Sequence, residues 1–184
     1  MARGWARLGK VARGCTRWRG VGKVARAEVE QGGVDRTENS IKLHYDVPGD
    51  DYTRAGEASA QVKQVLRKLG LLPQIIRRVS IAMYEGEINM SIHANGGEID
   101  VEIGPADISI TLRDTGPGIE DIDLAMKEGF STATEKVRSM GFGAGMGLPN
   151  IKKHSNHLKI DSTPGVGTTL YIRITISEEI IDDR

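Results

Sequence analysis

The sequence contains very little cysteine and no long apolar run, and each shortage excludes a class of protein. Cys15 is the only cysteine among 184 residues, which excludes an internal disulfide framework and favours a reducing compartment such as the cytoplasm. No apolar segment approaches the roughly 20 residues that span a bilayer. We therefore expect a soluble, cytoplasmic protein with no membrane partner.

The net charge of zero conceals an uneven distribution of charge. Residues 1–26 hold eight Lys or Arg and no acid, which leaves 17 basic residues against 25 acids and a charge near −8 for the remainder. An acidic body argues against nucleic acid as the main partner. A hydrophobic content of 39% is typical of a globular protein, and the length suits one domain with a tail.

The basic first segment is excluded from the predicted fold. Its seven glycines within 33 residues weaken any helix, and WARLGKVARG at 5–14 is nearly repeated by WRGVGKVARA at 18–27. A basic arm for an anionic partner and an Arg-rich targeting segment both remain open. We expect residues 1–39 to be a basic, Gly-rich, disordered extension and residues 40–184 to form one folded domain.

Hydrophobic periodicity in the body places helices early and strands late, with short hairpin turns between the strands. This order indicates an α+β fold, in which helices form one layer on a mixed, mainly antiparallel sheet. We expect strands over 41–47, 98–103, 108–114, 158–163 and 167–176, and helices over 51–71, 73–95, 119–129 and 148–155.

Three polar residues recur at a spacing of four on the second predicted helix. Glu85, Asn89 and His93 drift by only about 40° per step, so they line one helix face. An ordinary solvent-facing stripe would explain them. A hydrated Mg²⁺ would as well, because this ion prefers carboxylate and amide oxygens. Glu87 lies about 200° around the helix from Glu85 and faces elsewhere.

Glycine-containing motifs follow this helix. DTGPG at 114–118 comes directly after a predicted strand, GFGAGMG spans 141–147, and Gly167 and Thr168 begin the last strand. Glycine lets backbone N–H groups approach a ligand closely, and the helix after 147 could meet phosphate with its N-terminal amides. Each motif alone also fits a turn, a flexible surface loop or a hairpin. The sequence has neither a Walker loop nor a His-Arg-Asp catalytic loop.

Taken in order, these motifs resemble the Bergerat ATP-binding fold, the superfamily of gyrase, histidine kinases and MutL. The resemblance covers about residues 41–176 and implies that residues 40–184 form a histidine-kinase-like ATP-binding domain. It is greatest to the anti-sigma-factor and serine-kinase branch, especially the stressosome switch serine kinases, through GPGIEDIDLAMKEGFST, GFGAGMGLPNIKK and IDSTPGVGTT. Members of that branch are small single domains without a phospho-acceptor helix, so a histidine kinase fragment is the less favoured alternative.

The resemblance implies a role for each matching residue. Glu85 would be the general base, which suits a serine hydroxyl that must lose its proton as it attacks the γ-phosphate. Asn89 would bind Mg²⁺, and Asp114 would accept a hydrogen bond from the adenine amino group. For His93, a phosphate contact and a structural hydrogen bond are both open. The implied ATP-binding residues are Asn89, Asp114, Gly116, Gly118, Gly143, Gly145, Gly147 and Thr168.

The function implied by the resemblance is that of an ATP- and Mg²⁺-dependent serine/threonine kinase and anti-sigma regulatory factor. Its partner would be a STAS-type anti-sigma antagonist or a sigma factor, and relatives often form homodimers. A nucleotide-gated protein-binding switch with little turnover is the main alternative, and an ATPase subunit of a larger machine is a third. Three features depart from the pattern. The stretch TATEKVRSM lengthens the lid, which is the segment between FST and the glycines; Met90 replaces a small residue; and the basic N-terminal segment has no counterpart.

Overall fold

A computed structural model describes residues 40–49 and 54–176, so the basic segment 1–39 lies outside the described residues. None of the helices described there is long and apolar enough to cross a bilayer. In chain order the elements are β1 (Ile41–Pro48), α1 (Glu57–Lys68), α2 (Pro73–His93), β2 (Gly96–Ile103), β3 (Asp107–Arg113), α3 (Ile122–Ala125), α4 (Glu135–Ser139), α5 (Gly147–His154), β4 (His157–Thr163) and β5 (Gly167–Thr175).

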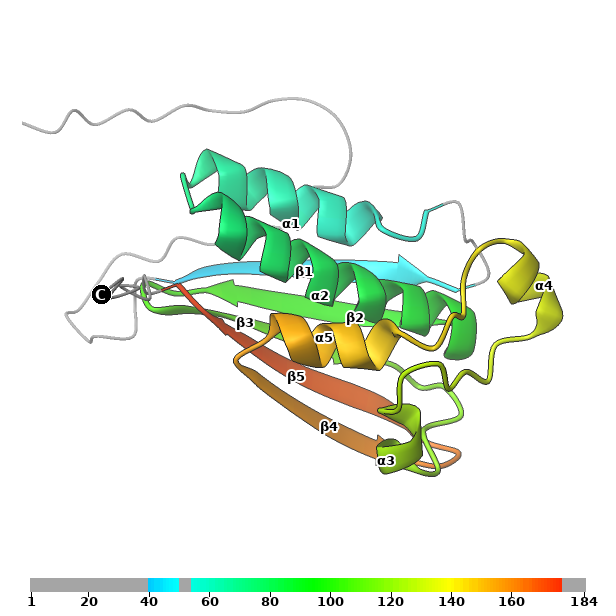
Figure 1. Ribbon diagram of the computed structural model, residues 1–184. Helices are drawn as coiled ribbons and strands as arrows, with labels where there is room; N and C mark the ends of the chain where they lie inside the picture. Colours follow the sequence, from blue (N-terminus) through cyan, green and yellow to red (C-terminus); the bar gives the residue numbers. More distant parts are fainter. Residues whose placement is uncertain (1–39, 50–53, 177–184) are drawn as a thin grey trace, which may run out of the picture.

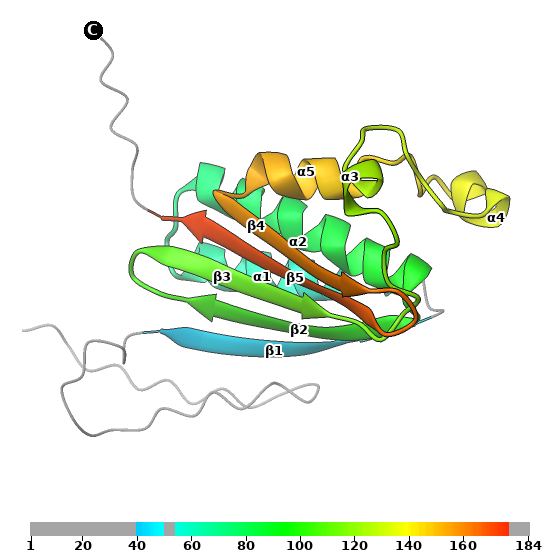
Figure 2. The ribbon, with the colours of Figure 1, turned by 90° about the horizontal axis from the view of Figure 1, so that it is seen from below.

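The described strands form one sheet in the order β1-β2-β3-β5-β4, and α1, α2 and α5 cover one of its faces (Figures 1 and 2). The predicted two-layer α+β fold is therefore confirmed. All four described strand pairs are antiparallel, whereas a mixed sheet was expected. The difference arises because β5 lies between β3 and β4, which run in the same direction but never pair.

Alternation along the strands divides the sheet into a buried and a polar face. In β3, Ile108, Ile110 and Leu112 are at most 1% exposed, while Thr111 and Arg113 lie on the opposite face. Successive side chains of a strand point to opposite faces, so this pattern places the core between the sheet and the helices. Burial of each such aliphatic side chain contributes about 1.5–3 kcal/mol.

Three helical segments differ from the sequence expectation. The helix predicted over 51–71 begins only at Glu57, after Gly56 in the left-handed conformation. The helix predicted over 119–129 is reduced to α3, because the Asp121 side chain caps Leu124 N–H and starts the helix late. The lid, which lies between Met126 and Met146, contains an unexpected helix, α4, whose first turn is capped by Thr134.

Glu87 holds the first turn of α1 from the neighbouring helix α2. Its carboxylate is 2% exposed and accepts hydrogen bonds from Ala58 N–H and Ser59 N–H, each at 3.0 Å. The first N–H groups of a helix lack intrahelical partners and lie at the positive end of its dipole. Since Gly56 offers no capping side chain, Glu87 fills that role. It faces α1 and not the Glu85 side, as predicted.

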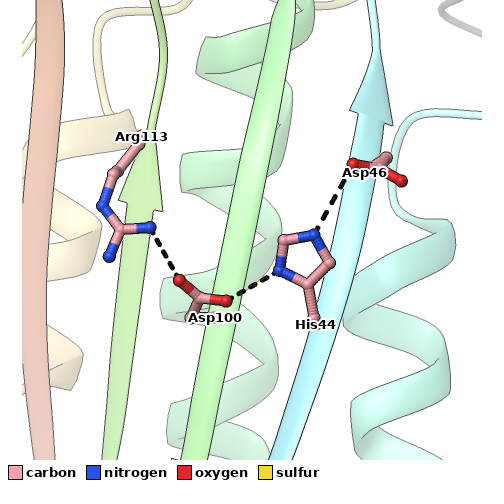
Figure 3. Close-up of polar contacts among 4 residues, drawn as sticks. All are labelled: His44, Asp46, Asp100 and Arg113. Atoms are coloured by element: carbon pink, nitrogen blue, oxygen red, sulfur yellow. Dashed lines mark hydrogen bonds and ion pairs between the residues drawn. The ribbon is translucent and has the colours of Figure 1, made fainter. Parts of the chain in front are cut away.

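A polar cluster joins three strands on the exposed sheet face (Figure 3). The two carboxylate oxygens of Asp100 accept hydrogen bonds from His44 Nδ1 and Arg113 Nη1, each at 2.7 Å. A carboxylate oxygen of Asp46 lies 3.6 Å from His44 Nε2. The hydrogen bond to Asp100 raises the pKa of His44, and the same bond lowers the pKa of Asp100. The cluster thus links β1, β2 and β3 through charge.

We predict that Glu87→Gln lowers the free energy of unfolding by about 1–3 kcal/mol, because an amide can accept only one of the two buried N–H groups. Urea denaturation followed by circular dichroism measures the loss. Glu128→Gln, at an exposed position, is the matched control and should change stability by less than about 0.5 kcal/mol. Equal stability of the two variants would contradict a capping role.

We predict that His44→Gln destabilises the fold most between about pH 4 and 6.5. The raised pKa of His44 means that its contribution is full below about 6.5 and is lost as the pH rises through the raised value. The lowered pKa of Asp100 means that its contribution is lost as the pH falls below about 4. Half of the His44 side chain is exposed, so the effect should stay below about 1 kcal/mol and shrink in salt. Urea midpoints across pH test this, and a pH-independent difference would contradict it.

Candidate functional site

A cavity of about 790 Å³ opens between α2, the end of the sheet and the segment that carries α3 and α4. Small-molecule and cofactor sites commonly have about 300–1,000 Å³. Glu85 and His93 line the cavity. So do seven of the eight residues predicted to bind ATP: Asn89, Asp114, Gly118, Gly143, Gly145, Gly147 and Thr168.

The α2 wall of the cavity contains the polar face that helical spacing predicted. Glu85, Asn89 and His93 all line it, while the buried residues Val79 and Met83 of the same helix belong to the core. Burial lowers the pKa of His93 below its ordinary value near 6.5, so its imidazole is neutral at neutral pH. This face therefore presents one carboxylate, one amide and one neutral imidazole.

Asp114 is fixed where β3 ends. Its backbone N–H donates to Thr168 O at 2.9 Å, and its Oδ1 accepts Gly116 N–H at 2.9 Å and Thr168 N–H at 3.1 Å. Within the described residues no hydrogen bond reaches Oδ2. Two N–H groups thus orient the carboxylate, and one of its oxygens remains available as an acceptor for a ligand in the cavity.

The two glycines after Asp114 have different surroundings. Gly116 is not among the cavity-lining residues; a Cβ there would lie 2.5 Å from Ala94 Cα, so glycine lets the loop cross the end of α2. Gly118 lines the cavity at a φ of 72°, and a Cβ would meet Thr163 O at 2.4 Å. The absence of a side chain is therefore required at both positions by neighbouring protein atoms.

Ser162 is a site-supporting residue that the sequence did not reveal. Its Oγ accepts Ile119 N–H at 2.8 Å and lies 2.9 Å from Thr168 Oγ1. It therefore joins the loop after Asp114 to the β4–β5 hairpin. A serine in a strand carries no local signal, because its importance comes from a partner 43 positions away.

The lid between Met126 and Met146 packs largely against itself. Gly129 N–H donates to Gly145 O at 3.0 Å, and Gly145, at a φ of 72°, leaves no room for a Cβ beside Phe130. Arg138 Nη2 donates to Ser131 O at 3.1 Å. These contacts account for Gly145 and Arg138 without a ligand, and close approach of the glycines to phosphate stays a prediction.

Helix α5 closes the cavity by lying antiparallel to α2. A Cβ on Gly147 would lie 3.0 Å from the Asn89 amide, Asn150 Nδ2 donates to Glu85 Oε1 at 2.6 Å, and Arg78 Nε donates to the carbonyl of His154 at 3.3 Å. Asn150 was missed by the sequence reasoning. Which face of α5 meets α2 is decided by packing, and no motif indicated it.

Basic residues lie around His154, the last residue of α5. The pKa of His154 is lowered first by burial and then by the positive charges of Lys153, Arg77 and Arg78, while Glu85 opposes this shift. Lys153 is exposed, as expected for a solvated side chain. The hydrogen bond that Glu85 accepts among the described residues comes instead from the neutral amide of Asn150.

Residues 78–179 match the family described as "Histidine kinase-, DNA gyrase B-, and HSP90-like ATPase". The serine/threonine-protein kinase RsbT of Bacillus subtilis is 31% identical over 112 residues, which cover 59% of this chain and 78% of the kinase. An anti-sigma F factor of Thermoanaerobacter sp. is 35% identical over 98 residues, which cover 50% of this chain and 65% of that protein.

A solved structure supports the fold independently. The SiaB–SiaC complex from Pseudomonas aeruginosa contains a chain that matches with a TM-score of 0.51 at 14% identity, covering 72% of this chain and 88% of its own. The family match spans more than half of the sequence and includes the α2 face, the Asp114 loop, the lid and the β4–β5 hairpin. This chain therefore belongs to the histidine kinase-, DNA gyrase B- and HSP90-like ATPase family.

Proposed function

We propose that this chain is an ATP- and Mg²⁺-dependent serine/threonine kinase that phosphorylates a STAS-type anti-sigma antagonist and acts as an anti-sigma regulatory factor. One observation carries the proposal: Glu85 lies on the cavity wall one helical turn before Asn89, in a chain similar to the kinase RsbT. A carboxylate at this place suits a hydroxyl acceptor, which must lose a proton when it attacks phosphorus.

The cavity fits an adenine nucleotide. The free oxygen of Asp114 is an acceptor for the adenine amino group, and Thr168 lies beside it with its hydroxyl held by Ser162. Gly147 and Leu148 at the start of α5 line the same cavity, and the first N–H groups of a helix are suited to binding phosphates. The cavity volume of about 790 Å³ is sufficient for such a ligand.

The residues present also fit Mg²⁺. The described residues contain no group of three or more His, Cys, Asp or Glu that could hold a metal by itself. Mg²⁺ commonly keeps several waters and takes few protein ligands beside substrate phosphates, and Asn89 offers one amide oxygen. Bound there, the ion would neutralise phosphate charge. Asn89 lines the cavity, and Gly147 lets the first turn of α5 lie against its amide.

The chain's own chemical contribution is proton transfer and positioning. As the serine Oγ–phosphorus bond forms and the bond between the γ-phosphorus and the β–γ bridging oxygen breaks, Glu85 takes the hydroxyl proton. Asn150 Nδ2 donates a hydrogen bond to Oε1 of Glu85, which leaves Oε2 to accept that proton. Asn89 and Asp114 hold opposite ends of the nucleotide in this proposal, so the reacting phosphate lies near Glu85.

A nucleotide-gated protein-binding switch is the second candidate. It is favoured by the similarity to anti-sigma F factors, one of which is 35% identical over 98 residues. In this case ATP would order the lid and a partner would bind with little turnover. Nucleotide-dependent capture of a partner without formation of a phosphoprotein would select this function over the kinase.

We predict that Asp114→Asn weakens ATP binding by about tenfold to a hundredfold, since one hydrogen bond to a charged acceptor is lost. The substituted side chain keeps an Oδ1 for Gly116 and Thr168 N–H, so the loop should remain folded. Isothermal titration calorimetry with Mg²⁺ measures the affinity. Asp161→Asn, on the exposed side of β4, is the control. Unchanged ATP affinity in Asp114→Asn would contradict the proposed hydrogen bond between Asp114 and adenine.

We predict that Glu85→Gln lowers the rate of phosphoryl transfer at least about a hundredfold, as expected for loss of a general base. Nucleotide affinity should stay within about threefold of wild type. The assay follows transfer from γ-³²P-labelled ATP to each purified STAS-type protein of the source genome. Glu98→Gln, on the exposed sheet face, is the control. Transfer by Glu85→Gln at the wild-type rate would refute the assignment.

A further inference from the structure

We propose that Asn150 is the positioning residue of Glu85, and this rests on the proposed function of Glu85 as the base. Its amide would hold one carboxylate oxygen so that the other meets the serine hydroxyl in a fixed orientation. The hydrogen bond from Asn150 Nδ2 to Glu85 Oε1 measures 2.6 Å, between two partly buried side chains. It is a charge-assisted bond, a class that is shorter and stronger than a neutral one.

The position of Asn150 is set by the packing of two helices that lie side by side in both views (Figures 1 and 2). Gly147 lies against Asn89, and the carbonyl of His154 accepts from Arg78. These contacts are the two ends of an antiparallel helix pair, and Asn150 lies between them, opposite Glu85. Its backbone N–H also donates to Met146 O at 2.8 Å, within the first turn of α5.

The hydrogen-bond donor to Glu85 is a neutral amide, which suits the proposed role of Glu85 as a base. Asn150 supplies the only hydrogen bond to Glu85 among the described residues. Arg78, a cation on the same helix, donates instead to His154 O and to Asn156 Oδ1, the latter at 2.7 Å. A directly paired cation would favour the charged carboxylate and oppose proton uptake. An amide orients the same group without adding charge.

The hydrogen bond from Asn150 would fix the orientation of the Glu85 carboxylate. A glutamate side chain has three torsions, so an untethered carboxylate samples many positions before one is productive. Fixing reacting groups in advance removes that search from the barrier, and misplacement of about 1 Å can cost about a hundredfold in rate. Asn150 would therefore change turnover more than ATP affinity, because Asn89 and Asp114 are proposed to hold the nucleotide.

The test is a double-mutant cycle on the full chain with γ-³²P-labelled ATP and the STAS-type protein that wild type phosphorylates. We expect Asn150→Ala to lower kcat about tenfold to a hundredfold, with KM for ATP within about threefold. Asn150→Gln retains the amide donor and should recover part of the loss. In a Glu85→Gln background, Asn150→Ala should cause no further decrease. Lys152→Ala, on the exposed side of α5, is the matched control and should keep the wild-type rate.

A second readout needs no nucleotide. In ¹⁵N-labelled protein, the Asn150 side-chain amide signals should shift on Glu85→Ala and stay in place in Lys152→Ala. A wild-type rate for Asn150→Ala, or an equal decrease in both Glu85 backgrounds, would overturn the positioning role while leaving the kinase intact. Wild-type chain that binds ATP but phosphorylates none of the STAS-type proteins would refute the proposed function, and the positioning role with it.

Discussion

The burial of α2 against the sheet, α1 and α5 is the constraint on which the rest of the structure depends. Its apolar residues, including Val79 and Met83, pack into the core and fix the rotation of the helix about its axis. Once that rotation is fixed, Glu87 must face α1 and Glu85 must face α5 and the cavity. Two carboxylates that are two positions apart thus acquire unrelated roles through helical geometry alone.

The remaining cavity walls come from segments that are distant in sequence. Asp114 and Thr168 are 54 positions apart and are joined by hydrogen bonds because β3 and β5 are neighbours in the sheet. Ser162 extends this junction to the loop after Asp114. The adenine side of the proposed site is therefore a property of strand pairing, and the β4–β5 hairpin supports it.

Glycines in the lid and at the start of α5 meet two structural requirements at once. Gly145 permits a backbone crossing with Gly129 and Phe130, and Gly147 permits α5 to touch Asn89. Both are explained by protein contacts. The same absence of side chains leaves backbone N–H groups accessible at the cavity, so internal packing and the proposed phosphate contacts require glycine at the same places.

The sequence by itself determined the α+β class, the positions of the core strands and the polar face of α2, because these follow from local periodicity. It also predicted most of the cavity wall through ordered motifs; Gly116 packs behind that wall. Only the tertiary structure decided that the four described strand pairs are all antiparallel, that Glu87 caps α1, and that Ser162 and Asn150 support the site. Those outcomes depend on which surfaces meet across 28 to 65 residues of chain, and no local pattern encodes a partner at that distance.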